Sequence, residues 1–429
     1  MIGTDQQPED QREEDNGAAP TRRRVIGAGV AGACAGVAGI ASACADHPED
    51  DSPGTVSLSG HAVHRERAAR AVAALQKNFA VDDGSDLLRE FHPTRSDGEP
   101  YSYEWPFSQA RIAVLELAHA GGHCEEAVGD LEALIDSRDR GQERYWHTPG
   151  GTTGLPGYAS ATDLEQGAHG TYFYDDNSWV ALAEIEEHLI TCGQRGNLER
   201  VHEVIALLRS AEATDPNQVR PGGLYWSQGD DGDRNTVATM PAAKILLRMH
   251  QITGDESFLE DAIRWVDWTR EHLLAPEGLF WDHVKRDGSI EKTFWSYNQG
   301  VPLGVEALLY RITGDAEHRK RAFELYRAIV EHYEVFDRGG RLDADQPVFF
   351  NAILCSNLLM AQALIGEEFE GVRITRAVAE RAWADQRDPA TDLLTKRNDQ
   401  GELEVLAQAG FARLLALAAM PRRHWADLC

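Results

Sequence analysis

From about residue 62 onward, apolar residues recur at the three- and four-residue spacing of amphipathic helices, and little of the chain alternates as a long strand would. The pattern also repeats. Residues 246–255 are echoed by residues 308–315, and both segments end in Ile-Thr-Gly-Asp. Glycine readily ends a helix in the left-handed conformation, and the aspartate after it can cap the next helix. The pattern therefore predicts a series of helical units.

Helix-ending glycines divide the chain into units of similar length. Their spacing runs from 52 (366 − 314) to 72 (193 − 121) residues, which leaves room for two helices and their loops. About six such hairpins fit into residues 61–425, and stacked units of this kind bury one another's apolar faces. We predict an all-α (α/α)6 toroid of six helical hairpins, with an open solenoid as the alternative. The glycines are Gly121, Gly193, Gly254, Gly314 and Gly366, and the predicted inner helices cover residues 107–119, 177–192, 239–253, 300–313, 351–365 and 403–419.

Aromatic and amide residues gather just before most of the predicted inner helices. A single aromatic cluster would normally belong to the core. Several clusters at equivalent positions of a closed repeat instead predict a shared cleft, in which ring faces stack on a carbohydrate. The segments concerned are 101–105, 173–176, 222–226 with 234–235, 294–300 and 349–350.

One of these segments carries two adjacent carboxylates, Asp175 and Asp176. Aspartates before an apolar helix often serve only as caps, because their oxygens accept free backbone N–H groups at the positive end of the helix. A pair of carboxyl groups is also what the cleavage of a glycosidic bond requires, one as the acid and the other as nucleophile or base. The aromatic surroundings favour the catalytic interpretation.

The ordered set of motifs resembles glycoside hydrolase family 76, the endo-α-1,6-mannanases. The resemblance is strong over about residues 100–365. It depends on aromatic-Asp-Asp-Asn-x-Trp-x-Ala-Leu-Ala at 174–183, Gly-Gly-Leu-Tyr-Trp at 222–226, Asn235 before Pro-Ala-Ala at 241–243, Trp-x-Tyr-Asn-Gln-Gly at 295–300 and Tyr-Arg-Ile-Thr-Gly-Asp at 310–315.

The resemblance implies a retaining hydrolase or transglycosidase for α-1,6-mannosidic linkages. Asp175 would be the nucleophile and Asp176 the general acid/base, and neither a metal nor a cofactor is expected. The expected partner is α-mannan or another mannose-containing glycan, in a polysaccharide or a lipoglycan. The residues that the motifs assign to substrate binding are Tyr174, Asn177, Tyr225, Trp226, Asn235, Trp295, Tyr297, Asn298 and Gln299.

The chain departs from the family pattern at two places, and these departures keep other functions open. The family has a second Asn near Thr239, and a Lys and an Arg at the fifth inner helix, where this chain has Asn351 and Ser356. One alternative is therefore a lipid-anchored, non-catalytic glycan-binding protein. The other is an (α/α)6 sugar isomerase or unsaturated uronyl hydrolase, against which an export signal counts.

The N-terminus predicts export. Arg22 and Arg23 precede a weakly hydrophobic Gly/Ala-rich run that ends near Ala43, as in a twin-arginine signal, and a membrane anchor is the weaker alternative. Residues 1–43 would then be the signal, Cys44 the residue that is lipidated if the end of the signal acts as a lipobox, and 44–60 a flexible tether. The expected location is extracellular or on the outer face of the cytoplasmic membrane.

Charge and cysteine content exclude two classes of function. The net charge of −28 (42 − 70) makes nucleic acid an unlikely partner. The cysteines are scattered without a Cys-x-x-Cys pair, so no zinc site is expected. Cys192 and Cys355 lie in apolar runs and are predicted to be buried.

Overall fold

The computed structural model describes residues 58–94, 100–121, 125–148, 150–229 and 232–429. The predicted signal 1–43, Cys44 and most of the tether 44–60 lie outside these residues. All described residues belong to one unit, Glu49–Cys429. No helix among them is long and apolar enough to cross a membrane.

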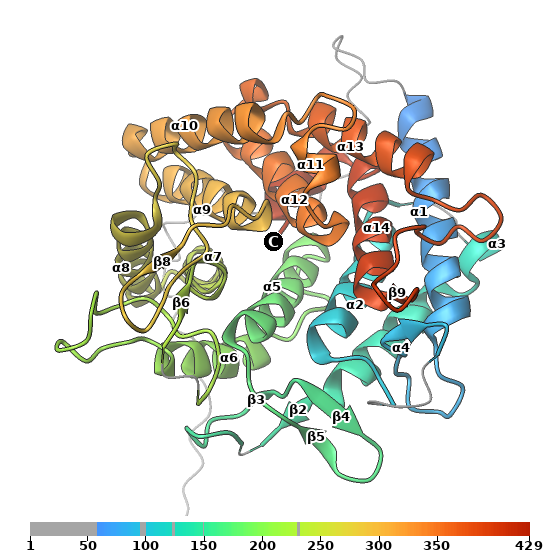
Figure 1. The fold of residues 1–429 in the computed structure, drawn as a ribbon, viewed down its shortest axis with the longest axis horizontal. Helices are drawn as coiled ribbons and strands as arrows, with labels where there is room; N and C mark the ends of the chain where they lie inside the picture. Colours follow the sequence, from blue (N-terminus) through green and yellow to red (C-terminus); the bar gives the residue numbers. More distant parts are fainter. Residues whose placement is uncertain (1–57, 95–99, 122–124, 149, 230–231) are drawn as a thin grey trace, which may run out of the picture. The chain divides into compact units, whose positions relative to one another are not determined.

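Helices pair into hairpins around a ring, as predicted (Figure 1). Each inner helix contacts the next, and α14 contacts α2, so that the series closes. The (α/α)6 toroid is therefore confirmed. The inner helices are α2 (Glu104–His119), α5 (Tyr174–Ile190), α7 (Thr236–Thr253), α9 (Tyr297–Thr313), α12 (Val348–Leu364) and α14 (Val405–Ala418). The outer helices are α1 (Leu58–Phe79), α4 (Leu131–Glu143), α6 (Leu198–Ser210), α8 (Glu256–Leu273), α10 (Ala316–Tyr333) and α13 (Gly371–Asp385).

Burial distinguishes the two rings. Residues 351–362 of inner helix α12 are buried without interruption, because neighbours surround the helix. Outer helix α8 instead buries a stripe that includes Phe258, Ala262 and Trp265, and its other face is polar. The inner helices therefore form the core.

The expected glycine and aspartate caps join two of the hairpins. Gly254 and Gly314 end α7 and α9 in the left-handed conformation, with φ of 74° and 70°. Asp255 and Asp315 then accept hydrogen bonds from backbone N–H groups in the first turns of α8 and α10. Gly366 differs, because its φ of 162° is extended backbone, and α12 ends at Leu364 without this cap.

Side-chain amides in the inner helices brace the loops that lead into them. Gln299 Oε1 accepts the N–H of Phe280 at 2.7 Å, and its Nε2 donates to the carbonyl of the same residue at 2.9 Å. Asn177 makes the same pair of bonds to Tyr158, at 2.7 and 2.9 Å. Loss of one brace would leave buried backbone groups unpaired, at about 1–3 kcal/mol for each group.

The first turns of five inner helices lie earlier than predicted. The structure starts α5 at Tyr174 rather than at 177, and α2, α7, α9 and α12 also begin three residues before the predicted residue. The aromatic and acidic residues that the sequence placed ahead of these helices are therefore partly inside their first turns. Their side chains project from rigid backbone rather than from loops.

Short strands and helical turns complete the described residues. The antiparallel pairs are β1 (Phe91–His92) with β9 (Leu403–Glu404), β2 (Trp146–His147) with β3 (Gly157–Tyr158), β4 (Ala161–Asp163) with β5 (Gly167–His169), and β7 (His283–Val284) with both β6 (Arg234–Asn235) and β8 (Ile290–Glu291). Short turns of helix are α3 (Glu125–Val128), α11 (Arg341–Ala344), η1 (Glu367–Phe369) and η2 (Arg422–Asp427).

One of the two cysteine predictions is wrong. Cys355 is buried and free, as predicted. Cys192 is exposed and disulfide-bonded, because it follows the last turn of α5, where the chain leaves the core. Its apolar neighbours, which suggested burial, belong to the helix before it.

Candidate active site

Aromatic residues from three inner helices meet at one end of the ring. Phe350 of α12 stacks on Tyr297 of α9, with ring centroids 3.9 Å apart and an interplanar angle of 11°. Trp105 of α2 and Trp295 also contact Phe350, at 6.2 and 5.5 Å. The predicted convergence of these segments is therefore present. Because the residues lie at helix N-termini, the partial positive charge of several helices also faces this end.

Asp175 lies in the first turn of α5 and is only 9% exposed. Trp226 donates its indole N–H to Asp175 Oδ2 at 3.1 Å, while Oδ1 is buried without a partner in the protein. Trp226 remains 39% exposed and packs on Phe173, with ring centroids 4.9 Å apart. The indole therefore orients one carboxylate and still presents a face to a ligand.

The two aspartates have different proton affinities. Burial raises the pKa of Asp175 from 3.8 to about 6, and the bond from Trp226 opposes this rise. Loss of hydration raises the pKa of Asp176 well above 3.8, and the negative charges of Asp175 and Glu104 raise it further. Burial thus disfavours the ionised form of both acids, and the charge of Asp175 adds to this at Asp176, whereas the Trp226 N–H favours the ionised form of Asp175. The pair can supply one nucleophile and one proton donor.

A further carboxyl group, Asp282, faces this pair, and sequence reasoning missed it. Asn298 Nδ2 donates to Asp282 Oδ1 at 2.8 Å, and the His283 ring lies 3.0 Å from Oδ2. The charge of Asp282 contributes to the raised pKa values of Asp175 and Tyr297. Asp282 follows an outer helix and belongs to no motif that we used, so only its position in space reveals it.

Tyr297 and Asn298 present polar atoms to the acidic cluster. Burial and the charges of Asp282, Asp175 and Asp176 raise the pKa of Tyr297 well above 10, so that its hydroxyl stays neutral. Asn298 is 1% exposed, and its Oδ1 is buried without a partner in the protein. Both residues remain candidates for the substrate contacts that the motif predicts.

Asn177 and Gln299 do not present their amide groups to a substrate. Both side chains are fully buried, and their amide groups are used in the braces to Tyr158 and Phe280 described above. Each also donates to a carbonyl four residues earlier, that of Phe173 or Trp295. No amide atom is left for a sugar, so we assign both residues a structural role in place of the predicted substrate contact.

Tyr174 and Tyr225 also point away from the acid pair. Tyr174 is 4% exposed, and its hydroxyl interacts with Ser210 of α6 and with Gln228. Tyr225 precedes Trp226 in an extended segment, where successive side chains point in opposite directions, and its hydroxyl donates to Gln218 at 3.0 Å. The motif therefore includes residues on both sides of the backbone, and these two support the loop.

Asn235 and Trp295 lie next to residues of the site, Asn235 beside the segment of Asp282 and Trp295 in the aromatic cluster. Asn235 lies at the N-cap position of α7 without a side-chain capping bond, is 7% exposed and has a buried Oδ1 without a partner in the protein. Its backbone pairs with His283, next to Asp282. Trp295 is half-buried, and its ring meets the edge of Phe350 in the aromatic cluster. Both remain candidates for substrate contact.

The positions that depart from the family pattern are used inside the protein. Asn351 accepts from Ser296 Oγ at 2.9 Å and donates to the Leu342 carbonyl at 2.8 Å, so it braces the ring like Gln299. Thr239 Oγ1 accepts the Leu224 N–H at 3.1 Å. Ser356 Oγ is also bound to a backbone carbonyl. These residues maintain the fold, and the acid pair does not depend on them for a hydrogen bond.

No cluster of three or more His, Cys, Asp or Glu side chains suited to a metal ion occurs in the part of the chain that the structure describes. The carboxyl groups of the site are instead near one another with aromatic and amide neighbours. Such a site suits acid–base and nucleophilic chemistry on a carbohydrate.

The toroid and the acidic and aromatic residues gathered at one end of it define a protein of the glycoside hydrolase class. The family model for glycosyl hydrolase family 76 matches residues 160–409, and the chain belongs to this family. A solved family 76 glycoside hydrolase from a bovine Bacteroides thetaiotaomicron strain has a similar fold, with a TM-score of 0.70 at 22% identity, over 83% of this chain and 77% of that one.

Two further comparisons concern named enzymes. The chain is 32% identical over 104 residues to mannan endo-1,6-alpha-mannosidase DCW1 of Candida glabrata, which is 22% of this chain and 23% of that protein. The chain thus aligns with less than a quarter of the length of this curated relative. The solved complex of an inactive GH76A α-1,6-mannanase of Salegentibacter with α-1,6-mannotriose, in which two consecutive aspartates are changed to asparagine, matches with a TM-score of 0.63 at 17% identity, over 83% of this chain and 99% of that one.

The buried state of Asp175 predicts a pH-dependent cost in stability. Unfolded Asp175 ionises near 3.8 and folded Asp175 near 6, so raising the pH through this window favours the unfolded chain. At about 1.4 kcal/mol per pH unit, Asp175→Asn should stabilise the fold by about 1–3 kcal/mol at pH 7, and the gain should shrink toward pH 4. Urea unfolding at several pH values measures this difference. Exposed Asp399→Asn is the control, and a gain for Asp175→Asn that does not change with pH would contradict the prediction.

Proposed function

We propose that the protein is an exported retaining glycoside hydrolase or transglycosidase that cleaves α-1,6-mannosidic linkages in mannan-type polysaccharide or lipoglycan. The observation that carries the proposal is the adjacent pair Asp175 and Asp176 in the first turn of α5, where burial raises the pKa values of both acids and the charge of Asp175 raises that of Asp176 further. The α-1,6-mannosidase named among the relatives and the bound α-1,6-mannotriose of the Salegentibacter enzyme support the choice of substrate.

The roles of the two acids follow from their surroundings. Asp175 accepts the Trp226 N–H, which opposes the rise in its pKa and favours its ionised form, so we assign it as the nucleophile. Burial and the negative charges of Asp175 and Glu104 raise the pKa of Asp176 and favour its protonated form, so we assign it as the general acid, which becomes the base in the second step. In the solved Salegentibacter complex, the protein is inactive when two consecutive aspartates are changed to asparagine. That pair supports the same assignment for this chain.

The acid pair also bears on the binding-protein alternative. A protein that only binds glycans needs aromatic faces and hydrogen-bond donors, but not two carboxyl groups kept from water at a cost in stability. Fold alone does not establish activity, so the variants of the acid pair are the deciding test.

Export is the second element of the proposal. It is supported by Arg22 and Arg23 ahead of the apolar run, and by the disulfide at Cys192, since disulfides persist in oxidising compartments. We further propose that Cys44 is lipidated and holds the protein at the outer face of the cytoplasmic membrane.

Asp175→Asn and Asp176→Asn should each lower kcat on linear α-1,6-mannan by about 100-fold or more, because groups of this kind are typically worth that factor. Products are separated by size, and α-1,2- and α-1,3-linked oligomers test the linkage. Asp399→Asn should retain full activity. If both variants of the pair keep more than about 1% of the activity, the catalytic assignment is wrong.

The first product released should have the α configuration of the substrate. Attack by Asp175 inverts the anomeric carbon and attack by water inverts it again, so that two inversions give retention. Proton NMR in the first minutes, before mutarotation, records the anomer. An initial β product would require a single displacement by water and exclude Asp175 as the nucleophile.

Replacing Arg22, Arg23 and Arg24 together by Lys should block export, because the charge is kept and only recognition of the arginines is lost. Fractionation of cells with an antibody to the protein measures the result. Cys44→Ser should separately release the exported protein from the membrane fraction. Normal export of the Lys variant would indicate the general secretory route instead.

A further inference from the structure

Glu104, in the first turn of α2, is a buried carboxyl group that the proposed mechanism has not used. Its side chain is fully buried. Gln142 of α4 donates its Nε2–H to Glu104 Oε1 at 2.7 Å, whereas Oε2 is buried without a partner in the protein. A charged oxygen in this position would lack compensation for its lost hydration, but a protonated oxygen would carry an O–H able to donate.

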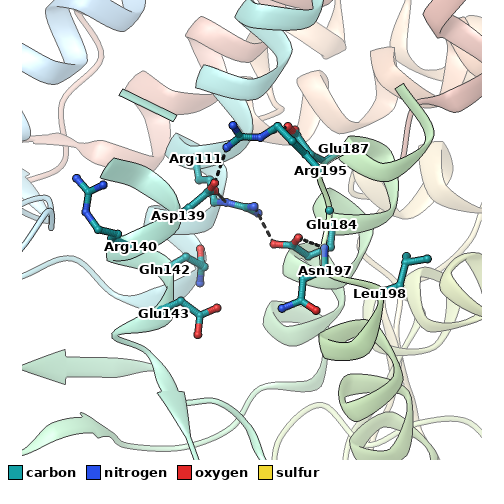
Figure 2. A pocket seen from close by; sticks show the side chains of 11 residues that line it. Arg111, Asp139, Arg140, Gln142, Glu143, Glu184, Glu187, Arg195, Asn197 and Leu198 are labelled. Carbon is teal, nitrogen blue, oxygen red and sulfur yellow. Dashed lines mark hydrogen bonds and ion pairs between the residues drawn. The ribbon is translucent and has the colours of Figure 1, made fainter. Parts of the chain in front are cut away.

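The guanidinium group that interacts electrostatically with Glu104 is already paired elsewhere. Arg111 donates to Asp139 from Nε at 2.8 Å and to Glu184 from Nη2 at 2.7 Å. Figure 2 shows this network in the wall of a pocket of about 580 Å³, which Gln142 also lines. Two carboxylates thus compensate the charge of Arg111, and little of it is available to hold Glu104 as an anion.

The other titratable neighbours of Glu104 also disfavour its ionisation. Burial and the negative charge of Asp175 raise the pKa of Glu104 to about 8, although Gln142 and Arg111 oppose the rise. Asp176 is the second acid within electrostatic reach. Tyr145, buried nearby, donates its hydroxyl to the Ser102 carbonyl at 2.6 Å and remains neutral. Below about pH 8, Glu104 is therefore a neutral acid beside the catalytic pair.

We propose that Glu104 is a positioning residue of this active site: a neutral carboxylic acid whose O–H stabilises the Asp176 carboxylate each time Asp176 gives up its proton. The proposal rests on the function proposed above and adds a third acid to it. It explains why Glu104, which has one oxygen without a partner and no free counter-ion, lies next to the carboxyl groups of Asp175 and Asp176.

The proton balance is simple. In the first step, Asp175 bonds to the anomeric carbon, the glycosidic C–O bond breaks, and the proton of Asp176 moves to the leaving oxygen. In the second step, a water oxygen bonds to the anomeric carbon, its proton returns to Asp176, and Asp175 is released. Glu104 keeps its own proton throughout. When Glu104 itself ionises, Asp176 would have to become an anion beside another anion, and turnover should fall.

Two substitutions of Glu104 distinguish the effect of its hydrogen-bond donor from the effect of its titrating carboxyl group. Glu104→Gln keeps an N–H donor that does not titrate, whereas Glu104→Leu removes the donor. At pH 6–7, Glu104→Gln should keep kcat within about threefold of the wild type, and Glu104→Leu should lower kcat about 10-fold or more with little change in KM, as expected for an interaction made mainly in the transition state. The wild-type activity should fall above about pH 8, and the Glu104→Gln variant should remain active to higher pH.

Glu116→Gln is the matched control. Glu116 is fully buried in the same helix and is bonded to Arg413 at 2.7 Å, twelve residues and about 18 Å along the axis from Glu104. The Glu116→Gln substitution should lower the midpoint temperature of thermal unfolding and leave the pH dependence of activity unchanged. The proposal is overturned if Glu104→Gln leaves the alkaline limb in place, or if it loses as much activity as Glu104→Leu. If the Glu104→Leu variant does not fold, the pH dependence of the activity of Glu104→Gln is by itself the test of the proposal.

Infrared titration tests the protonation state without substrate. Between pH 7 and 9, the wild type should lose a C=O band of a protonated carboxyl group with a midpoint near 8, and Glu104→Gln should lack this transition. Burial raises the pKa of Glu116 to about 7, and the Glu116→Gln variant removes that separate transition. The transition near pH 8 should persist in Glu116→Gln. An unchanged transition in Glu104→Gln would refute the neutral-acid assignment. A wild type that is inactive on every mannan would instead refute the proposed function, and the infrared result would still decide the state of Glu104.

Discussion

The rest of this structure depends on one kind of interaction. In it, a side-chain amide forms hydrogen bonds to both the N–H and the C=O of a single loop residue. Asn177 holds Tyr158 and Gln299 holds Phe280 in this way, nineteen residues earlier in each case. Each brace fastens the loop before an inner helix to the first turn of that helix. The brace supplies partners for the N–H and C=O groups of Tyr158 and Phe280, which would otherwise be buried without a hydrogen bond.

Because the loops are fastened, the first turns of the inner helices can be both buried and rigid. Asp175 lies two residues before one brace and Tyr297 two residues before the other. The braces therefore fix the backbone of Asp175 and Tyr297, and the polar atoms of these two side chains are not needed to fasten the loops. Asp175 Oδ1 and Asn298 Oδ1 are left without protein partners, which is unusual for buried oxygens and is typical of a site prepared for a ligand.

The same burial creates the chemistry. In water, Asp175, Asp176 and Glu104 would all be ionised at neutral pH. Desolvation and mutual repulsion raise all three pKa values, and the Trp226 N–H opposes the rise at Asp175. The surroundings thus favour the protonated forms of Glu104 and Asp176, whereas the Trp226 N–H favours the ionised form of Asp175. Burial of these acids thus lowers the stability of the folded protein, as is common at the active sites of enzymes.

Local signals in the sequence were sufficient for the helices, for the caps at Gly254 and Gly314 and for the acid pair, because each depends on neighbours within a few residues. They were insufficient for Tyr225 and Trp226, which share a motif but point to opposite sides of an extended backbone. They were also insufficient for Glu104 and Asp282, which belong to segments about 70 and 107 residues from Asp175 along the chain. Ring closure brings these segments together. Since desolvation and Coulomb interactions depend on distance in space and not along the chain, the protonation of the site is a property of the folded ring alone.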